Sequence, residues 1–231
     1  MATLNKQLFG NIKGTFGTAV FRQRKGNNYI AQRPASYNPP NDEAYLLRIE
    51  KFRLASKISS TIVANPELKN IWQTVVPKNQ NVYNYLIAKV YPFLDLAAVK
   101  PAFSIVPSSG VGITIDSATW ANDKLTISLQ ALTEASKIDA NYEKKALIHS
   151  LLFLSSPTSE NLPAYDVINI LSNTVNINLV DPLSFEFSFS TSLQNILSGY
   201  TKKSVFASML TYDDENSLVN YSSTIYHHYS S

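Results

Sequence analysis

The pattern of hydrophobic and polar residues changes twice along the chain. Up to about residue 40, short β-prone runs alternate with glycine and proline; from about 41 to 100, apolar residues recur every three to four positions; beyond 100, they form short or alternating runs. This pattern predicts an α+β protein: a basic N-terminal arm with a β-hairpin (1–40), a segment of two to three helices (41–100) and an antiparallel, immunoglobulin-like or fibronectin-like β-sandwich (101–231).

The N-terminal arm contains the signals of one hairpin. Two β-prone runs, residues 18–21 and 29–31, flank Gly26-Asn27-Asn28, which tolerates the positive φ angles of a tight turn. A hairpin is therefore predicted over 18–33. An extended connector should follow it, because proline neither continues a helix nor donates a hydrogen bond in a central strand. The prolines concerned are Pro34, Pro39 and Pro40.

Helical periodicity begins after this connector. Asn41 or Asp42 is a suitable N-cap for a helix that runs to about residue 63. Pro66 suits the first turn of a second helix over 66–76, and a third is predicted over 81–90. The first helix should bury a stripe that includes Tyr45, Ile49 and Phe52, and the later helices should place their aromatic residues in the core: Trp72, Tyr83, Tyr85 and Tyr91.

About eight strands are predicted in the last part of the chain. Alternation is clearest over 125–129 and 185–189, where every second residue is apolar, as in a strand with one buried face. Residues 192–199 have the spacing of a short helix. The predicted strands are 111–115, 124–131, 145–154, 166–169, 174–179, 184–190, 204–212 and 220–226.

Composition excludes several kinds of site and reveals a charge gradient. The chain has 231 residues and no cysteine, which excludes disulfides, thiolate nucleophiles and cysteine-ligated zinc. The net charge of +3 is the sum of +6 in residues 1–41, which contain no acid, +3 in residues 42–100 and −6 in residues 101–231. Such asymmetry suggests an acidic or polyanionic partner, or head-to-tail association between copies. Charges that merely solvate the arm explain it equally well.

Residues of a recognisable type recur at fixed spacings along the chain. They are Gly14, Gly17, Arg22, Gly26, Ile30 and Pro34, then Arg48 and Phe52, then Trp120 before the run 125–129, and finally 210–216 with Val219, Tyr221 and Ser222. This pattern resembles an uncharacterised, domain-of-unknown-function family of small bacterial and phage-associated proteins. The resemblance implies a glycine-spaced basic arm, helices and an immunoglobulin-like sandwich in a bacterial or phage setting, without implying an activity.

The sequence contains no catalytic or metal-binding signature. A Ser-His-Asp hydrolase needs a histidine, and the three present are His149, in an apolar run, and the adjacent His227 and His228. Adjacent residues of a strand point to opposite faces, which is a poor geometry for ligating one metal ion. Asp213-Asp214-Glu215 lacks the glycine and terminal glutamate of a calcium loop and is interpreted as a turn. We therefore expect no enzymatic activity, no cofactor and no metal.

The first functional hypothesis is a structural subunit of a self-assembling oligomer, such as a phage virion or tail component or a filament. An exposed hairpin edge is a template for strand addition, so the arm would contact neighbouring copies or other structural subunits. Its apolar residues would supply the contact, and its basic residues would meet the acidic half of a neighbour. The predicted contact residues are Val20, Phe21, Arg22, Arg24, Lys25, Tyr29, Ile30 and Arg33.

Two alternatives stay open. A nucleic-acid-binding protein would use the basic residues of the arm on phosphates and Phe21 and Tyr29 for stacking. An immunoglobulin-like surface recognition module would need export, and the N-terminus has no apolar segment of a secretion signal. No apolar run approaches the roughly 18 residues of a membrane span. We expect synthesis in the cytoplasm, with a virion or an extracellular assembly as the destination.

Overall fold

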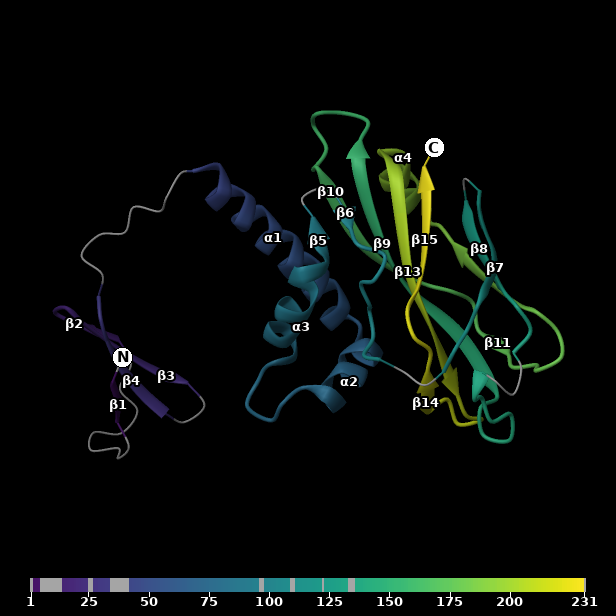
Figure 1. The fold of residues 1–231 in the computed structure, drawn as a ribbon, viewed down its shortest axis with the longest axis horizontal. Coiled ribbons are helices and arrows are strands. Elements are labelled where there is room, and N and C mark those ends of the chain that lie inside the picture. The colour runs from purple at the N-terminus through teal and green to yellow at the C-terminus, as the bar shows by residue number, and fades with distance from the viewer. Residues whose placement is uncertain are drawn as a thin grey trace. The chain divides into compact units, whose positions relative to one another are not determined.

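The computed structural model describes residues 2–4, 14–24, 27–33, 42–95, 98–108, 111–121, 123–132 and 136–230. The chain divides into two compact units, Met1–Tyr45 and Leu46–Ser231 (Figure 1). Four α-helices and several antiparallel sheets lie within the described residues, so the protein is mixed α+β. The predicted proline-rich connector falls outside them.

The first unit is a four-stranded antiparallel sheet with the order β1-β4-β3-β2. Its central hairpin is the predicted one, with Phe21 paired to Ile30 across the two strands. Gly17 opens the two-residue turn between β2 and β3 with a φ of 58°, a position that suits glycine. None of residues 14–22, 28–33 and 42–45, whose burial is described, is buried. The strands are β1 Ala2–Leu4, β2 Gly14–Phe16, β3 Ala19–Arg24 and β4 Asn27–Gln32.

Local signals place all four helices. The side chains of Asp42, Asn65, Asn81 and Ser190 accept hydrogen bonds from the first turns of the four helices in chain order. All three predicted long helices and the predicted short one are confirmed. The helices are α1 Glu43–Ala64, α2 Pro66–Val75, α3 Val82–Val90, followed by a 3₁₀ turn at Tyr91–Phe93, and α4 Thr191–Ser198.

The predicted apolar stripe of α1 is not buried. Phe52 is 53% exposed, and Tyr45 and Ile49 are half-buried. The helix buries Leu54 and Ile58, which lie beside that stripe in the sequence pattern, together with Ile62. The buried residues of α1 lie between Leu54 and Ile62, so only the later turns of the helix pack in the core and the earlier apolar positions do not. Of the four aromatic residues expected in the core, Trp72 is buried and its indole N–H donates to the Ile105 carbonyl at 2.8 Å, while Tyr83 is outside the core cluster.

Two long strands form the centre of the second unit. β9 (Lys145–Pro157) and β13 (Tyr200–Tyr212), of 13 residues each, pair antiparallel along most of their length. Each outer side of this pair is shared by two shorter strands. Beside β9 lie β10 Tyr165–Leu171 and β11 Val175–Asn176, and beside β13 lie β14 Leu218–Tyr221 and β15 Ile225–Ser230.

A second, smaller sheet has the order β12-β8-β7. Its middle strand alternates as predicted, with Leu125, Ile127 and Leu129 buried. The strands are β7 Ile115–Trp120, β8 Lys124–Leu129 and β12 Leu183–Ser188, and a separate pair of two-residue strands is formed by β5 Leu94–Asp95 and β6 Ala98–Val99.

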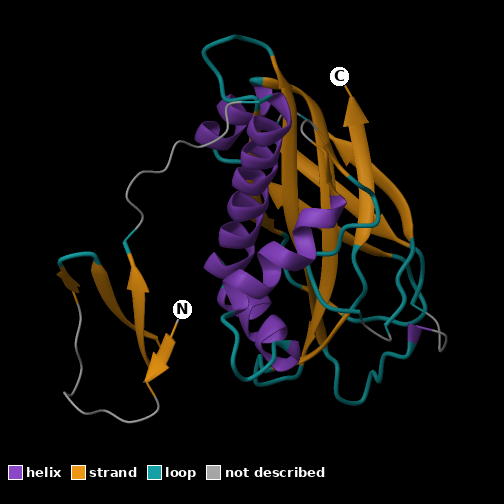
Figure 2. Ribbon diagram, turned by 60° about the vertical axis from the view of Figure 1, so that its left-hand side comes forward, coloured by secondary structure: helices purple, strands orange, loops and turns teal. Residues whose placement is uncertain are grey.

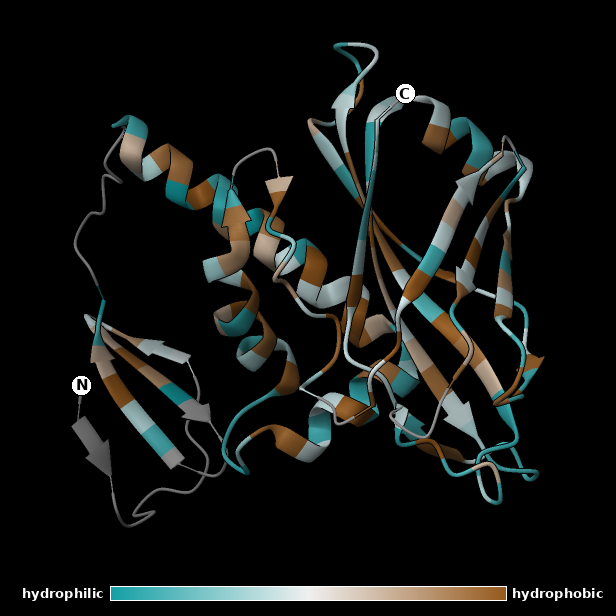
Figure 3. Cartoon of the chain, turned by 45° about the vertical axis from the view of Figure 1, so that its right-hand side comes forward, coloured by the Kyte–Doolittle hydropathy of each residue, from teal (hydrophilic) through white to brown (hydrophobic). Residues whose placement is uncertain are grey.

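The central sheet is covered on both faces, by α1–α3 on one side and by the smaller sheet on the other (Figures 1 and 2). Alternate residues of the long strands enter two different cores. Phe153 and Phe206 pack with the helices, whereas Leu152 and Val205 pack with the smaller sheet. Hydrophobic residues accordingly follow one another along the central strands, without a polar face (Figure 3). The unit therefore has three layers: helices, central sheet and smaller sheet.

Two of the predicted strands are wrong. Of residues 111–115, Val111 makes an isolated bridge and Ile115 begins β7, the strand that forms here, whose register shifts between Ile115 and Ser117. The shift breaks the apolar alternation that sequence analysis depends on. Residues 220–226 belong to two strands, β14 and β15, because the chain is diverted at the buried Ser222. Its hydroxyl accepts from the Met209 N–H, and its carbonyl accepts from the Ser208 hydroxyl.

None of the described helices is both long enough and apolar enough to cross a membrane.

Replacing Phe206 tests the helix-facing core. Its ring is fully buried, 5.0 Å from the Phe103 ring and 5.1 Å from the Tyr226 ring between centroids. Phe206→Ala should lower the free energy of unfolding by about 3–5 kcal/mol, measured by urea denaturation. The matched control Phe52→Ala, on the exposed side of α1, should cost less than about 1 kcal/mol. An equal decrease in the free energy of unfolding in the two variants would contradict the burial of Phe206 in the helix-facing core.

Candidate functional site

The predicted contact residues of the N-terminal sheet are divided between its two faces. Residues paired directly across antiparallel strands lie on the same face. One face carries Phe21 and Ile30, which pair with each other, and Phe16, which pairs with Ala19 and is 82% exposed. This apolar face is defined by Phe16, Phe21 and Ile30.

The opposite face combines a cation with an aromatic ring. Arg22 is exposed and pairs with Tyr29, and Val20 lies on the same side of β3. Val20 and Tyr29 therefore lie on the opposite face of the sheet from Phe21 and Ile30, because adjacent residues of a strand point to opposite faces, and their contact with a partner stays a prediction. Arg22 and Tyr29 define the basic face.

The remaining predicted residues lie at the margins of this sheet. Arg33 follows β4, is exposed, and its backbone N–H donates to the Thr18 carbonyl at 2.6 Å. Arg24 pairs with Asn27 at the end of the hairpin, but its side chain is outside the described set. Lys25 lies outside the described residues.

The two edges of the predicted hairpin are not free. β2 pairs with β3 over residues 14–16, and β1 pairs with β4 over residues 2–4. The expectation that both hairpin edges await another chain is therefore wrong, because segments of the arm itself occupy them. The outermost strands are instead the three-residue β1 and β2.

The acidic cluster in the second unit is the turn between β13 and β14. The Asp213 carboxylate accepts from the Ser217 N–H at 2.8 Å, and Asn216 adopts a φ of 61°. Asp214 and Glu215 are exposed at the tip. This confirms the interpretation of Asp213-Asp214-Glu215 as a turn and presents a local negative charge at the surface.

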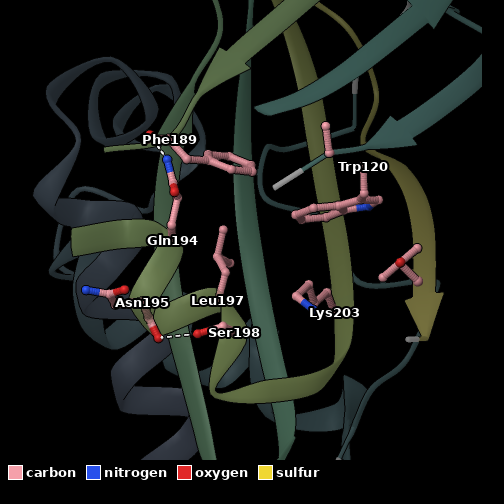
Figure 4. A pocket seen from close by; sticks show the side chains of 9 residues that line it. Trp120, Phe189, Gln194, Asn195, Leu197, Ser198 and Lys203 are labelled. Carbon is pink, nitrogen blue, oxygen red and sulfur yellow. Dashed lines mark hydrogen bonds between the residues drawn. The ribbon is translucent and has the colours of Figure 1, made fainter. Parts of the chain in front are cut away.

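A pocket of about 440 Å³ lies where β7, β12 and β15 end and β13 begins. Trp120 and Lys203 lie on one side of it, opposite Gln194 and Leu197 of α4 (Figure 4). The Trp120 ring is 5.8 Å from Phe189 and 5.7 Å from Tyr229 between centroids. The pocket is therefore walled by three aromatic rings from three different strands or their ends.

Lys203 is the charged group of this pocket. It is 8% exposed, and its ammonium donates to the Tyr200 carbonyl at 3.0 Å and lies 5.4 Å from the Tyr229 ring centroid. Among the described residues, no carboxylate lies within 4.0 Å of it. Burial lowers the pKa of this ammonium from its ordinary value, since the charged form has lost water without gaining an anion.

A second polar group is buried on the helix-facing side of β9. His149 is 2% exposed, and its Nε2 lies 2.6 Å from Glu67 Oε2 at the start of α2. The Asn65 side-chain amide is 3.1 Å from His149 Nδ1, while its Oδ1 accepts from the N–H groups of Glu67 and Leu68. Because capping fixes the Asn65 oxygen, its NH₂ must donate to Nδ1, and the histidine proton must be on Nε2, donating to Glu67.

This arrangement favours neutral His149. A proton on Nδ1 would face the Asn65 NH₂, which is also a donor. Burial lowers the pKa of His149, and the hydrogen bond and charge of Glu67 oppose that shift without cancelling it. Tyr212 is buried nearby, and burial together with the Glu67 carboxylate raises the pKa of its phenol. His149, Asn65 and Glu67 form a hydrogen-bonded structural network that joins α2 to the central sheet, whereas the buried Tyr212 hydroxyl has no hydrogen-bond partner among the described residues.

Sequence analysis missed the residues of the pocket as a group. Trp120 and Lys203 are 83 positions apart, and only the facing of two sheets brings them together. One signal was available: Lys203 begins the alternating series Lys203, Val205, Ala207, Met209, in which the other members are buried on one face. A lysine in phase with an apolar series marks a buried charge.

Comparison with known proteins does not assign the chain to a family. No protein-family model matches it, and no curated protein matches it.

The neutral state of His149 predicts acid sensitivity. Because the folded pKa lies below the ordinary value of 6.5, the unfolded chain binds more protons just below that pH, and stability falls as the pH is lowered through 6.5. The loss contributed by this one proton is at most about 1.4 kcal/mol per pH unit. Thermal unfolding between pH 7.5 and 5.0 should show it.

Asn65→Asp is the matched variant for this measurement. It keeps an N-cap oxygen but replaces the donor facing Nδ1 with an acceptor, which favours the protonated imidazole. The loss of stability between pH 7.5 and 5.0 should therefore shrink or change sign. An unchanged pH dependence in Asn65→Asp would contradict the assigned tautomer.

Proposed function

We propose that this chain is a non-enzymatic structural subunit of an assembly and that its N-terminal sheet contacts a neighbouring copy. The observation that carries the proposal is the incomplete burial of the apolar face of that sheet. Phe16, Phe21 and Ile30 share one side of it; Phe16 is 82% exposed, and Phe21 and Ile30 are half-buried. A sheet normally buries its apolar face against a second layer, and this unit contains one layer only.

The occupant of that face is a second copy of the chain. Residues 1–41 carry +6 and residues 101–231 carry −6, so the two parts of neighbouring copies attract each other. The exposed Asp214 and Glu215 form part of the densest acidic run in the chain. Burial of each large apolar residue is worth about 1.5–3 kcal/mol, whereas an exposed ion pair is worth about 0–1 kcal/mol. The apolar face thus supplies the affinity, and the charges supply the orientation.

The setting of the assembly rests on the sequence resemblance alone. The glycine-spaced basic N-terminus is similar to small phage-associated proteins, which supports a virion or tail component. A filament satisfies the same contacts, since a head-to-tail contact that does not close generates a fibre.

One observation favours nucleic-acid binding as a second candidate. Arg22 and Tyr29 are cross-strand neighbours on the basic face, which combines a phosphate partner with a ring on which a base can stack. Among the described residues, this combination of a cation and a ring consists of Arg22 and Tyr29 alone, and two residues are a small surface for binding nucleic acid. The facing sheets of the second unit likewise support an immunoglobulin-like recognition module as the third candidate.

Self-association of the full chain tests the proposal. Phe21→Asp places a charge in the apolar face and should raise the dissociation constant of the oligomer by about 10- to 100-fold, measured by sedimentation equilibrium. Phe21→Leu, which keeps the face apolar, should assemble nearly as well as the unaltered chain. Added salt should weaken assembly only in part, because the charges contribute less than the apolar contact.

Deleting residues 1–40 provides the second measurement. Both cores lie within Leu46–Ser231, so the shortened chain should fold and remain monomeric. An oligomer of unchanged size in this variant would overturn the proposal. Binding of single-stranded DNA by the full chain, lost in Arg22→Ala without a change in oligomeric state, would favour the second candidate instead.

A further inference from the structure

We propose that the pocket around Lys203 and Trp120 binds a small monocarboxylate carried on a ring. The inference does not depend on the proposed assembly, because every residue that lines the pocket belongs to the second unit. It rests on the donors left unfilled in the pocket, on the number of charges and on the nature of the walls.

The Lys203 ammonium is the charged donor that a ligand in the pocket would meet. It has three N–H groups and one hydrogen bond, to the Tyr200 carbonyl. The Trp120 indole N–H has no acceptor among the described residues, but it is fully buried at the ring edge away from α4 (Figure 4), so it does not serve the pocket. The Gln194 NH₂ already donates to the Phe189 carbonyl at 2.9 Å, as the dashed line in Figure 4 shows. A buried ammonium with unfilled N–H groups is costly, so the complementary ligand carries acceptor oxygens.

The single positive charge of the pocket favours a ligand with one negative charge. Lys203 is the single cation among the residues that line it. A phosphate dianion is usually held by several cations or by an arginine fork, and all five arginines of the chain lie at or before Arg53. A carboxylate carries one charge and two acceptor oxygens, which matches one buried ammonium.

The aromatic and aliphatic side chains that line the pocket favour a ligand that contains a ring. Trp120, Phe189, Tyr229 and Leu197 provide aromatic and aliphatic surface, and a volume of about 440 Å³ lies within the range of small-molecule sites. Asn195 and Ser198 are exposed at the α4 side of the pocket, where they can meet hydroxyl groups. A ring carboxylate of this kind can be an aromatic acid or a sugar acid, and the two share the interactions with Lys203 and the rings.

Fluorescence of Trp120 gives a direct measurement. The chain has two tryptophans, so Trp72→Phe leaves Trp120 as the single indole. Titration of this variant with phenylacetate and with glucuronate should change the emission with a dissociation constant in the millimolar range or tighter, and glucose and benzyl alcohol should bind at least tenfold more weakly. Binding of phenylacetate alone identifies an aromatic acid, and binding of glucuronate alone identifies a sugar acid.

Lys203→Met is the decisive variant. It keeps the length of the side chain and removes the charge, so it should weaken binding of the acids by about tenfold or more. It should be at least as stable as the parent, because it removes a buried charge without an anionic partner. Lys202→Met, at the exposed neighbouring position, is the matched control and should bind normally.

Two results would overturn the proposal. One is that the folded parent protein binds neither acid at concentrations up to about 20 mM, measured by fluorescence and by isothermal calorimetry. The other is equal binding by the parent and by Lys203→Met. Should Lys203→Met fail to fold, Lys203→Gln serves in its place: it keeps a polar side chain and removes the charge, and calorimetry should show several-fold weaker binding of the acid that the parent binds. Unchanged affinity in Lys203→Gln would then reject the assigned role of the ammonium.

Discussion

The pairing of β9 with β13 is the constraint on which the second unit depends. The two strands are 13 residues long and pair from Tyr200–Pro157 at one end to Tyr212–Lys145 at the other. Both faces of this pair are apolar, with Phe153 and Phe206 on one and Leu152 and Val205 on the other. An antiparallel pair of this kind cannot leave one face in water, so it requires two separate covers. The helices supply one cover, and the smaller sheet supplies the other.

The same constraint explains why polar groups on these strands are consequential. Most side chains of β9 and β13 are buried, with Lys202 as an exposed exception, and a buried polar residue is costly unless it has a hydrogen-bond partner inside the protein. His149 finds Glu67 and Asn65, and both of its ring nitrogens are satisfied in the neutral form. Lys203 finds a backbone carbonyl and an aromatic ring but no carboxylate among the described residues. The first group is complete in itself, whereas the second leaves a charge unbalanced.

The N-terminal unit obeys a different physical balance. Its sheet has apolar residues on one face, yet none of its residues whose burial is described is buried. Four short strands in a single layer provide hydrogen bonds but little removal of apolar surface from water, and such sheets gain independent stability mainly by packing on a second layer. The second unit therefore buries two cores, whereas the residues of the first unit whose burial is described form none.

The sequence by itself determined the elements whose signals are local. Asn65 before Pro66, and Asn81 before the third helix, cap helices through bonds to residues two or three positions away, so the helix starts were predictable. The hairpin of β3 and β4 was predictable for the same reason. The tertiary structure decided what depends on distant pairing: the interruption at Ser222, the register shift in β7, and the facing of Trp120 toward Lys203. His149 and Glu67 are 82 positions apart, and no local pattern specifies which element packs over a given strand face.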